Sequence, residues 1–434
     1  MKRLSIILIL IAIVAVMPTP AEPVVLTEDA VIERIRSHNL GLQAQRALLD
    51  ARERTARTAS NVLIPSVRIS TGLIRTNEET VPMPPGEPYS MSSSSTLEVQ
   101  LQLSVAILEG TRTAGLARDA AVASYHETRT QTEETVRIAF HALLLLREGV
   151  DVARWGLESA AVHLEQVADA YSAGLASERI LRTAESATVE ARTTVRRLET
   201  EYQGASGALA AALSYPAGTS IEASGALLQA DTHPVPPVDY ESTSLHNRTD
   251  IQKIDAQRRL QQSLVRARTL QQRTPSLSVT QSWNATQLDP FKADNPLPRS
   301  SMDRGTLSVM LAMPLDSLLP GSAGSVAISN ERDALRSLEL QQQQTRLSAL
   351  EEIASLTRTL EQSTAHIDAL TGKVNLAEQI YDLTGEAYNE GLASYLEVRD
   401  AERELQGARF DLLNERYTYT TTRIRLEYAT GANR

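Results

Sequence analysis

The chain has 434 residues, a formal charge of −10 and no cysteine. The lack of cysteine excludes a disulfide framework, a thiolate metal site and a cysteine nucleophile. The acidic charge balance also argues against nucleic-acid binding, which requires a basic face. Only 4% of the residues are aromatic although 42% are hydrophobic, and such a composition favours long helices over a compact aromatic core.

The N-terminal segment has the pattern of a secretory signal peptide. Lys2 and Arg3 precede an apolar run over residues 4–17, and the small residue Ala21 follows. The alternative is a membrane anchor helix, but the run is shorter than the roughly 20 residues that a span needs. We therefore expect residues 1–21 to be a signal peptide and the chain to be exported.

Residues 22–215 are predicted to form a first structural repeat. A half-length helical run is followed by two segments, at about residues 66–74 and 96–107, in which apolar and polar residues alternate. A period of two residues indicates β-strands with one apolar face. A helical run of about 60 residues comes next, and a shorter one leaves the turn-like stretch 171–177.

The same order of elements recurs after a connection. Residues 216–240 are rich in proline and glycine and are predicted to be a linker or equatorial segment between the halves. Residues 241–434 then form a second repeat, with strands at about 276–284 and 305–313 and a turn at about 388–394.

The two turn-like stretches carry nearly the same letters. "AYSAGLAS" covers residues 170–177 and "AYNEGLAS" covers 387–394, an offset of 217 residues, half of the chain. A glycine can end the first helix in the left-handed conformation, and a serine can cap the next helix. The glycines are Gly174 and Gly391, and the serines are Ser177 and Ser394. Each stretch is therefore predicted to be the tip of a helical hairpin.

Strands of about ten residues with one apolar face are typical of outer-membrane barrels. The alternative is an antiparallel sheet in a soluble protein with one face in water. Four strands cannot close a barrel alone, and open edges are not tolerated in lipid. If the strands lie in a membrane, several copies of the chain must pool them.

The sequence resembles the TolC-like outer-membrane efflux proteins over nearly the whole mature chain. The resemblance depends on the order of elements, on the doubled Y-x-x-G-L-A-S tip and on prolines at the strand boundaries. These boundaries are Pro65-Ser66, Pro275-Ser276 and Met313-Pro314-Leu315.

The resemblance implies a mainly α fold with a membrane β-barrel portion. Two tandem repeats would form, as a homotrimer, a 12-stranded barrel in outer-membrane lipid that is continued by an α-helical periplasmic tunnel. Such proteins are exit ducts of tripartite efflux or type I secretion systems, with a periplasmic adaptor (membrane fusion protein) and an inner-membrane transporter as partners. Drugs, metal ions and secreted proteins all leave through such ducts. The alternative function is a periplasmic coiled-coil adaptor or scaffold without a pore.

The family carries acidic residues inside the tunnel entrance, after the second tip. The matching positions are Glu397 and Asp400, which in a trimer would form two stacked acidic rings that favour cations. Two alternatives stay open. Ser394 and Glu397 also fit a capping box, and both carboxylates could belong to a solvated helix face.

The tips are expected to contact the adaptor and to gate the entrance. The residues concerned are Tyr171, Gly174, Leu175, Ser177, Arg179, Tyr388, Gly391, Leu392 and Ser394. In relatives a tyrosine and an arginine of the second tip bond to an aspartate of the first; the tyrosine matches Tyr388, but Ala393 and Ile180 occupy the other positions. Tyr171 and Tyr388 also fit a heptad seam, so core packing is an alternative role for both.

No enzyme motif is found in the sequence. There is no P-loop, no G-x-S-x-G, no H-E-x-x-H and no dinucleotide fingerprint. We therefore expect no catalytic residue, no metal site and no cofactor.

Overall fold

The structure is a computed structural model, and it describes residues 23–80, 89–225, 227, 244–288, 290 and 304–431. The chain divides into two compact units. The first unit comprises residues 1–44, 127–248 and 347–434, and the second comprises residues 45–126 and 249–346. The expected signal peptide, residues 1–21, lies outside the described residues.

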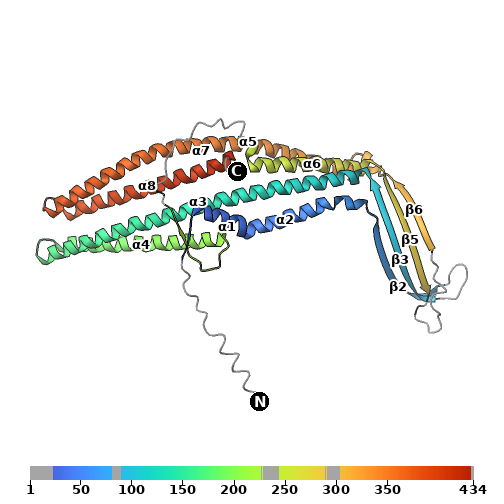
Figure 1. Cartoon of the computed structure of the whole chain (residues 1–434), viewed down its shortest axis with the longest axis horizontal. Helices are drawn as coiled ribbons and strands as arrows, with labels where there is room; N and C mark the ends of the chain where they lie inside the picture. Colours follow the sequence, from blue (N-terminus) through green and yellow to red (C-terminus); the bar gives the residue numbers. More distant parts are fainter. Residues whose placement is uncertain are drawn as a thin grey trace, which may run out of the picture. The chain divides into compact units, whose positions relative to one another are not determined.

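Most of the described chain is helical, with two sheets (Figure 1). The helices are α1 (Glu28–His38), α2 (Leu40–Arg57), α3 (Val105–Ser172), α4 (Glu178–Ala212), α5 (Ser244–Asn247), α6 (Thr249–Arg273), α7 (Ala323–Asn389) and α8 (Tyr395–Thr430), with the short 3₁₀ turns η1 (Ala59–Leu63) and η2 (Asp316–Leu318). The strands are β1 (Val24–Leu26), β2 (Ser66–Thr80), β3 (Tyr89–Ser104), β4 (Ile221–Ala223), β5 (Ser276–Leu288) and β6 (Arg304–Ala312).

The first unit contains two helical hairpins. The first hairpin pairs the C-terminal part of α3 with α4, and the second pairs the C-terminal part of α7 with α8 (Figure 1). In the second hairpin, Leu360 and Ile367 of α7 are seven residues apart, and they pack in one cluster with Leu412 and Tyr419 of α8, which have the same spacing. Heptad spacing keeps one apolar stripe of each helix facing its partner over many turns, which explains the length of the hairpins.

Two short strands complete the core of the first unit. β1 and β4 pair in parallel, with Val24 opposite Ile221 and Leu26 opposite Ala223. Ile221 is fully buried in a cluster with residues of α1, α3 and α4. The predicted linker 216–240 therefore contains a strand in its described part, and the sequence pattern alone did not place it.

The second unit contains a four-stranded antiparallel sheet in the order β2-β3-β5-β6. The central pairing joins the two halves of the sequence, with Leu101 opposite Val279 and Leu103 opposite Leu277. Val309 and Leu311 of β6 continue these rows. Directly opposed residues lie on the same face of a sheet, so the alternation predicted for each strand produces one apolar face across all four.

The apolar face of this sheet is largely uncovered in a single chain. Ile69 of β2 and Leu311 of β6 are 76% and 72% exposed. Each of these two strands also has one edge that pairs with no other strand in the described part of the chain. Unpaired edges and exposed apolar rows are unfavourable in water, so a single chain leaves the sheet incomplete.

The observed strand limits differ from the predicted ones. β3 ends at Ser104, three residues before the expected end, because the Ser104 hydroxyl accepts a hydrogen bond from the Ile107 N–H (3.3 Å) and so starts α3. β2 and β3 also extend beyond the expected limits, to Thr80 and back to Tyr89, because Arg75 pairs with Met91 and Thr80 pairs with Tyr89 where the apolar alternation has already stopped. β5 likewise extends to Leu288.

None of the described helices combines the length and the hydropathy that crossing a membrane requires.

Candidate functional site: the hairpin tips

The two tips have the same backbone geometry. Gly174 has φ 74° and Gly391 has φ 76°, in the left-handed region that favours glycine. In the first tip the Leu175 N–H donates to the Ala170 carbonyl at 2.8 Å; in the second the Leu392 N–H donates to the Ala387 carbonyl, also at 2.8 Å. These bonds satisfy carbonyls that a helix end leaves free, so the repeated letters encode the same turn twice.

Both tips present a bare apolar side chain. Leu175 is 85% exposed and Leu392 is 78% exposed. Tyr171 is also exposed, at 43%. The alternative expectation that Tyr171 packs in the helical core is therefore wrong, because the seam ends before the last turn of α3.

An apolar cluster below the tips joins the two hairpins. Val167 and Ala184 of the first hairpin pack against Tyr395 of the second, and all three are buried. Tyr388 and Ile180 pack at the edge of this cluster. Ile180 thus makes an apolar contact in the position where relatives carry the aspartate of the latch, and Tyr388 is a packing residue here.

The acidic residues after the second tip are both exposed but differ in their contacts. The Glu397 carboxylate accepts hydrogen bonds from the Ser394 N–H (2.6 Å) and the Ser394 hydroxyl (2.9 Å). The bond from the Ser394 N–H, together with the bond from the Ser394 hydroxyl, lowers the pKa of the Glu397 carboxyl. Asp400 is 67% exposed and pairs with Arg399 at 3.2 Å. The structure thus gives Glu397 the capping contact that the sequence also allowed, and leaves the Asp400 carboxylate open to solvent.

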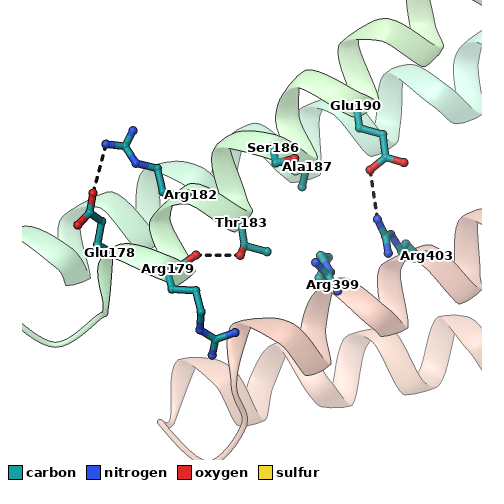
Figure 2. Close-up of a pocket in the computed structure, with 9 residues that line it drawn as sticks. All are labelled: Glu178, Arg179, Arg182, Thr183, Ser186, Ala187, Glu190, Arg399 and Arg403. Atoms are coloured by element: carbon teal, nitrogen blue, oxygen red, sulfur yellow. Dashed lines mark hydrogen bonds and ion pairs between the residues drawn. The ribbon is translucent and has the colours of Figure 1, made fainter.

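A groove of about 520 Å³ lies between α4 and α8, and its lining begins at Glu178, the first residue of α4 (Figure 2). Its charged lining consists of Glu178, Arg179, Arg182, Glu190, Arg399 and Arg403. Two ion pairs cross or border it. Arg403 of α8 pairs with Glu190 of α4 at 3.2 Å, and Arg182 pairs with Glu178 at 3.4 Å along α4.

The sequence singled out only part of this groove. Arg179 was named beside the first tip, whereas Arg399 and Arg403 were not. Their i, i+4 spacing places both on one face of α8, and this was the available signal. In the described residues neither Glu178 nor Arg179 forms an ion pair with the second hairpin, and Glu190 with Arg403 connects α4 to α8 near the tips. Glu190 and Arg403 are both exposed, so their pair contributes on the order of 0–1 kcal/mol. Farther along the helices, Arg137 of α3 pairs with Glu427 of α8 at 3.0 Å.

Comparison with known proteins identifies the family. The family model described as outer membrane efflux protein matches residues 31–214 and 242–432, one match in each repeat. The chain belongs to the outer membrane efflux protein family. The predicted resemblance is confirmed, and the two matched segments coincide with the two halves of the sequence. No curated protein sequence matches the chain.

Solved structures of other outer membrane proteins and channels share the fold. VceC, an outer membrane protein of Vibrio cholerae, is 19% identical with a TM-score of 0.76, and the match covers 93% of this chain and 96% of that one. The outer membrane channel CmeC of Campylobacter jejuni is 15% identical with a TM-score of 0.78, covering 93% and 85%. MtrE of Neisseria gonorrhoeae, an outer membrane channel in its open state, is 17% identical with a TM-score of 0.75, covering 93% and 88%. The mainly helical fold with two tandem repeats and a strand portion is therefore that of the channel-tunnel proteins.

Proposed function

We propose that this outer membrane efflux protein is a homotrimeric exit duct that conducts substrates from a periplasmic assembly across the outer membrane. The observation that carries the proposal is the four-stranded sheet, whose apolar face is exposed and whose edge strands, β2 and β6, each have one unpaired edge. Pairing β6 of one copy with β2 of the next satisfies both edges. Three copies would supply twelve strands, and an outer apolar face is what lipid requires.

The helical part of the chain fits the same role. α3 and α7 have 68 and 67 residues, and each leads from the sheet to a hairpin tip. We place the tunnel in the periplasm, with energy supplied by an inner-membrane transporter and with a periplasmic adaptor at the tips. The exposed Leu175 and Leu392 support the last point, since an exposed apolar side chain on each tip is suited to a protein contact.

We further propose that Asp400, with Glu397, lines the tunnel entrance. Both side chains are exposed within the first two turns of α8, and three copies of each would concentrate negative charge at a constriction. Of the two, Asp400 is the better candidate, because the Glu397 carboxylate caps its own helix.

Planar-bilayer recordings on the purified protein test both the proposed duct and the proposed acidic entrance. Heat-modifiable oligomers from outer-membrane fractions should conduct ions, and a soluble periplasmic product without conductance would refute the duct. Asp400→Ala with Glu397→Ala should weaken block by multivalent cations. The matched control is Glu361→Ala with Asp368→Ala, which removes the same charge from exposed positions on α7. Unchanged block in the entrance variant would refute the ring assignment alone.

A further inference from the structure

Exposed apolar side chains continue past the ends of two strands in the second unit. Val105 follows Leu103 of β3, and Met313 follows Leu311 of β6, at the same two-residue spacing as the apolar rows of the sheet. Both side chains and the next large apolar ones along the chain are 47–65% exposed; the latter are Leu108 of α3 and Leu315, Leu318 and Leu319 around η2. Such a surface is unfavourable in water. The apolar face therefore extends from the strands onto the segments that follow them.

Arginines outnumber acidic residues where the helices meet this sheet. We counted charges in the twelve residues on the helical side of β2, β3, β5 and β6, which are residues 54–65, 105–116, 264–275 and 313–324. The arginines are Arg54, Arg57, Arg112, Arg266, Arg268 and Arg273, and the acidic residues are Glu109 and Asp316. Glu53, just outside, pairs with Arg57 at 3.0 Å. With Glu53 included, six arginines face three carboxylates, an excess of three positive charges in a chain whose net charge is −10.

Two of these arginines lie exposed at the end of α6, which leads into β5 (Figure 1). Arg266 and Arg273 are seven residues apart, close to two helical turns, so they share one face of the helix. Neither forms an ion pair within the part of the chain that the structure describes. The Ser317 hydroxyl of η2 donates to the Gln272 carbonyl at 2.7 Å, which brings the exposed leucines around η2 close to Arg273.

A cavity of about 920 Å³ marks the opposite side of the same helices. It borders the polar face of the sheet at Ser66, Gln100, Gln102 and Ser276, and on the helices it is lined by Ala106 and Ile107 of α3 and by Leu264, Ala267, Arg268 and Gln271 of α6. At 3.6 residues per turn, Arg266 and Arg273 point away from these lining residues of α6. Val105, Leu108 and Arg112 likewise point away from the lining residues of α3. The unpaired arginines and the exposed apolar side chains thus share the side of the apolar face.

The order of these residues matches the order of layers at a membrane surface. Along α3, Val105 and Leu108 come first and Arg112 follows, about 10 Å from Val105 at 1.5 Å per residue. On each side of a bilayer the hydrocarbon is bordered by a headgroup region roughly 5–7 Å thick. Long arginine side chains can reach this region while their stems stay on apolar surface. Since the proposed function places the apolar face of the sheet in lipid, the arginines on the same side come level with the headgroups.

We propose that Arg112, Arg266 and Arg273 form a basic collar that binds the phosphate groups of anionic phospholipids in the periplasmic leaflet of the outer membrane. The inference rests on the proposed function, which places the sheet in lipid, and it adds the class of lipid around the duct. A guanidinium fork fits a phosphate with two parallel hydrogen bonds. Basic groups at a membrane surface favour anionic over zwitterionic lipids. The exposed apolar side chains next to the collar contact the acyl chains.

The test uses native mass spectrometry of the purified full chain in detergent, with phosphatidylglycerol and phosphatidylcholine of the same acyl chains added in equal amounts. The unmodified chain should retain phosphatidylglycerol over phosphatidylcholine by roughly threefold or more. Arg112→Gln with Arg266→Gln and Arg273→Gln should bring the ratio of the two retained lipids close to one. Retention of phosphatidylcholine should stay the same, because its contact is with the apolar side chains.

A matched control removes the same charge from α4. Arg192→Gln with Arg196→Gln and Arg197→Gln neutralises three exposed arginines, one of them paired with a glutamate as Arg112 is, and should leave the lipid ratio unchanged. Equal retention of both lipids by the unmodified chain, or equal loss of preference in the two triple variants, would overturn the proposal.

Two further outcomes would assign the arginines to another ligand. Loss of the lipid preference on adding inorganic phosphate at matched ionic strength would indicate a site for a small anion and overturn the collar. Loss of oligomers in the collar variant, with an unchanged lipid ratio, would indicate a contact between copies of the chain and overturn it as well. Conductance of the same preparations in planar bilayers separates the two proposals: conducting channels without a lipid preference refute the collar alone, and absence of conductance refutes the duct.

Discussion

A buried glutamate in α8 gives a pH dependence that can be measured directly. Glu402 is only 8% exposed. Desolvation by burial raises its pKa from 4.5 to about 7, although a hydrogen bond with Ser159 and the charge of Arg403 act in the other direction. Ser159 lies on α3 and bonds to the Tyr381 hydroxyl of α7 at 3.1 Å. The Glu402 carboxyl is thus located where three helices of the two hairpins meet.

The sign and size of the effect follow from the two protonation equilibria. Below pH 4.5 the carboxyl is neutral in both folded and unfolded chains, so burial of the charge costs nothing. Between pH 4.5 and about 7 the unfolded chain ionises first, and the free energy of unfolding falls as the pH rises. Above pH 7 the free energy of unfolding falls no further. The total loss is up to about 3 kcal/mol, since each unit of difference between the folded and unfolded pKa corresponds to about 1.36 kcal/mol.

Glu402→Gln removes the ionisation while keeping the shape of the side chain. We expect the variant to be more stable than the unmodified chain at pH 8, by up to about 3 kcal/mol, and the difference to shrink as the pH falls to 4.5. Guanidinium unfolding at fixed protein concentration measures it. The control is Glu361→Gln at an exposed position of α7. A difference between variant and unmodified chain that stays the same from pH 4.5 to pH 8 would refute the reasoning.

Two further predictions concern the tip and the acid side of the stability curve. Gly391→Ala should lower the free energy of unfolding by about 1–2 kcal/mol, because alanine is strained at φ 76°. Gly407→Ala is the control inside α8, where nothing lies within 4 Å of the added carbon, and it should raise the free energy of unfolding by about 1 kcal/mol. Equal shifts of the melting temperature in the two variants would contradict this prediction. Glu28 accepts hydrogen bonds from His141 and Arg137, which lower its pKa to about 2, so its contribution is present above pH 4.5 and is lost as the pH falls toward 2. In Glu28→Gln the free energy of unfolding should therefore fall less steeply as the pH is lowered from 4.5 toward 2. An equally steep fall in the variant and the unmodified chain would contradict a stabilising contact of Glu28 with His141 and Arg137.

The sequence by itself determined the features that depend on local patterns. The hairpin tips follow from a glycine and a serine at fixed offsets, and each strand was visible as a period of two residues. The long helices were visible as helical runs of about 60 residues. All of these patterns involve residues that are close together in the sequence, so a single sequence is enough to recognise them.

Only the tertiary structure decided the features that depend on distant residues. The pairing of β1 with β4 joins three-residue strands far apart in sequence, and no local pattern marks such a contact. Whether Glu402 is buried depends on the face that α8 turns toward Ser159. The groove between Arg179 and Arg399 likewise exists only because α4 and α8 lie side by side. The neighbours of a charged side chain on a helix depend on which other helix packs against it. That packing depends on long-range contacts, which the periodicity of a sequence does not encode.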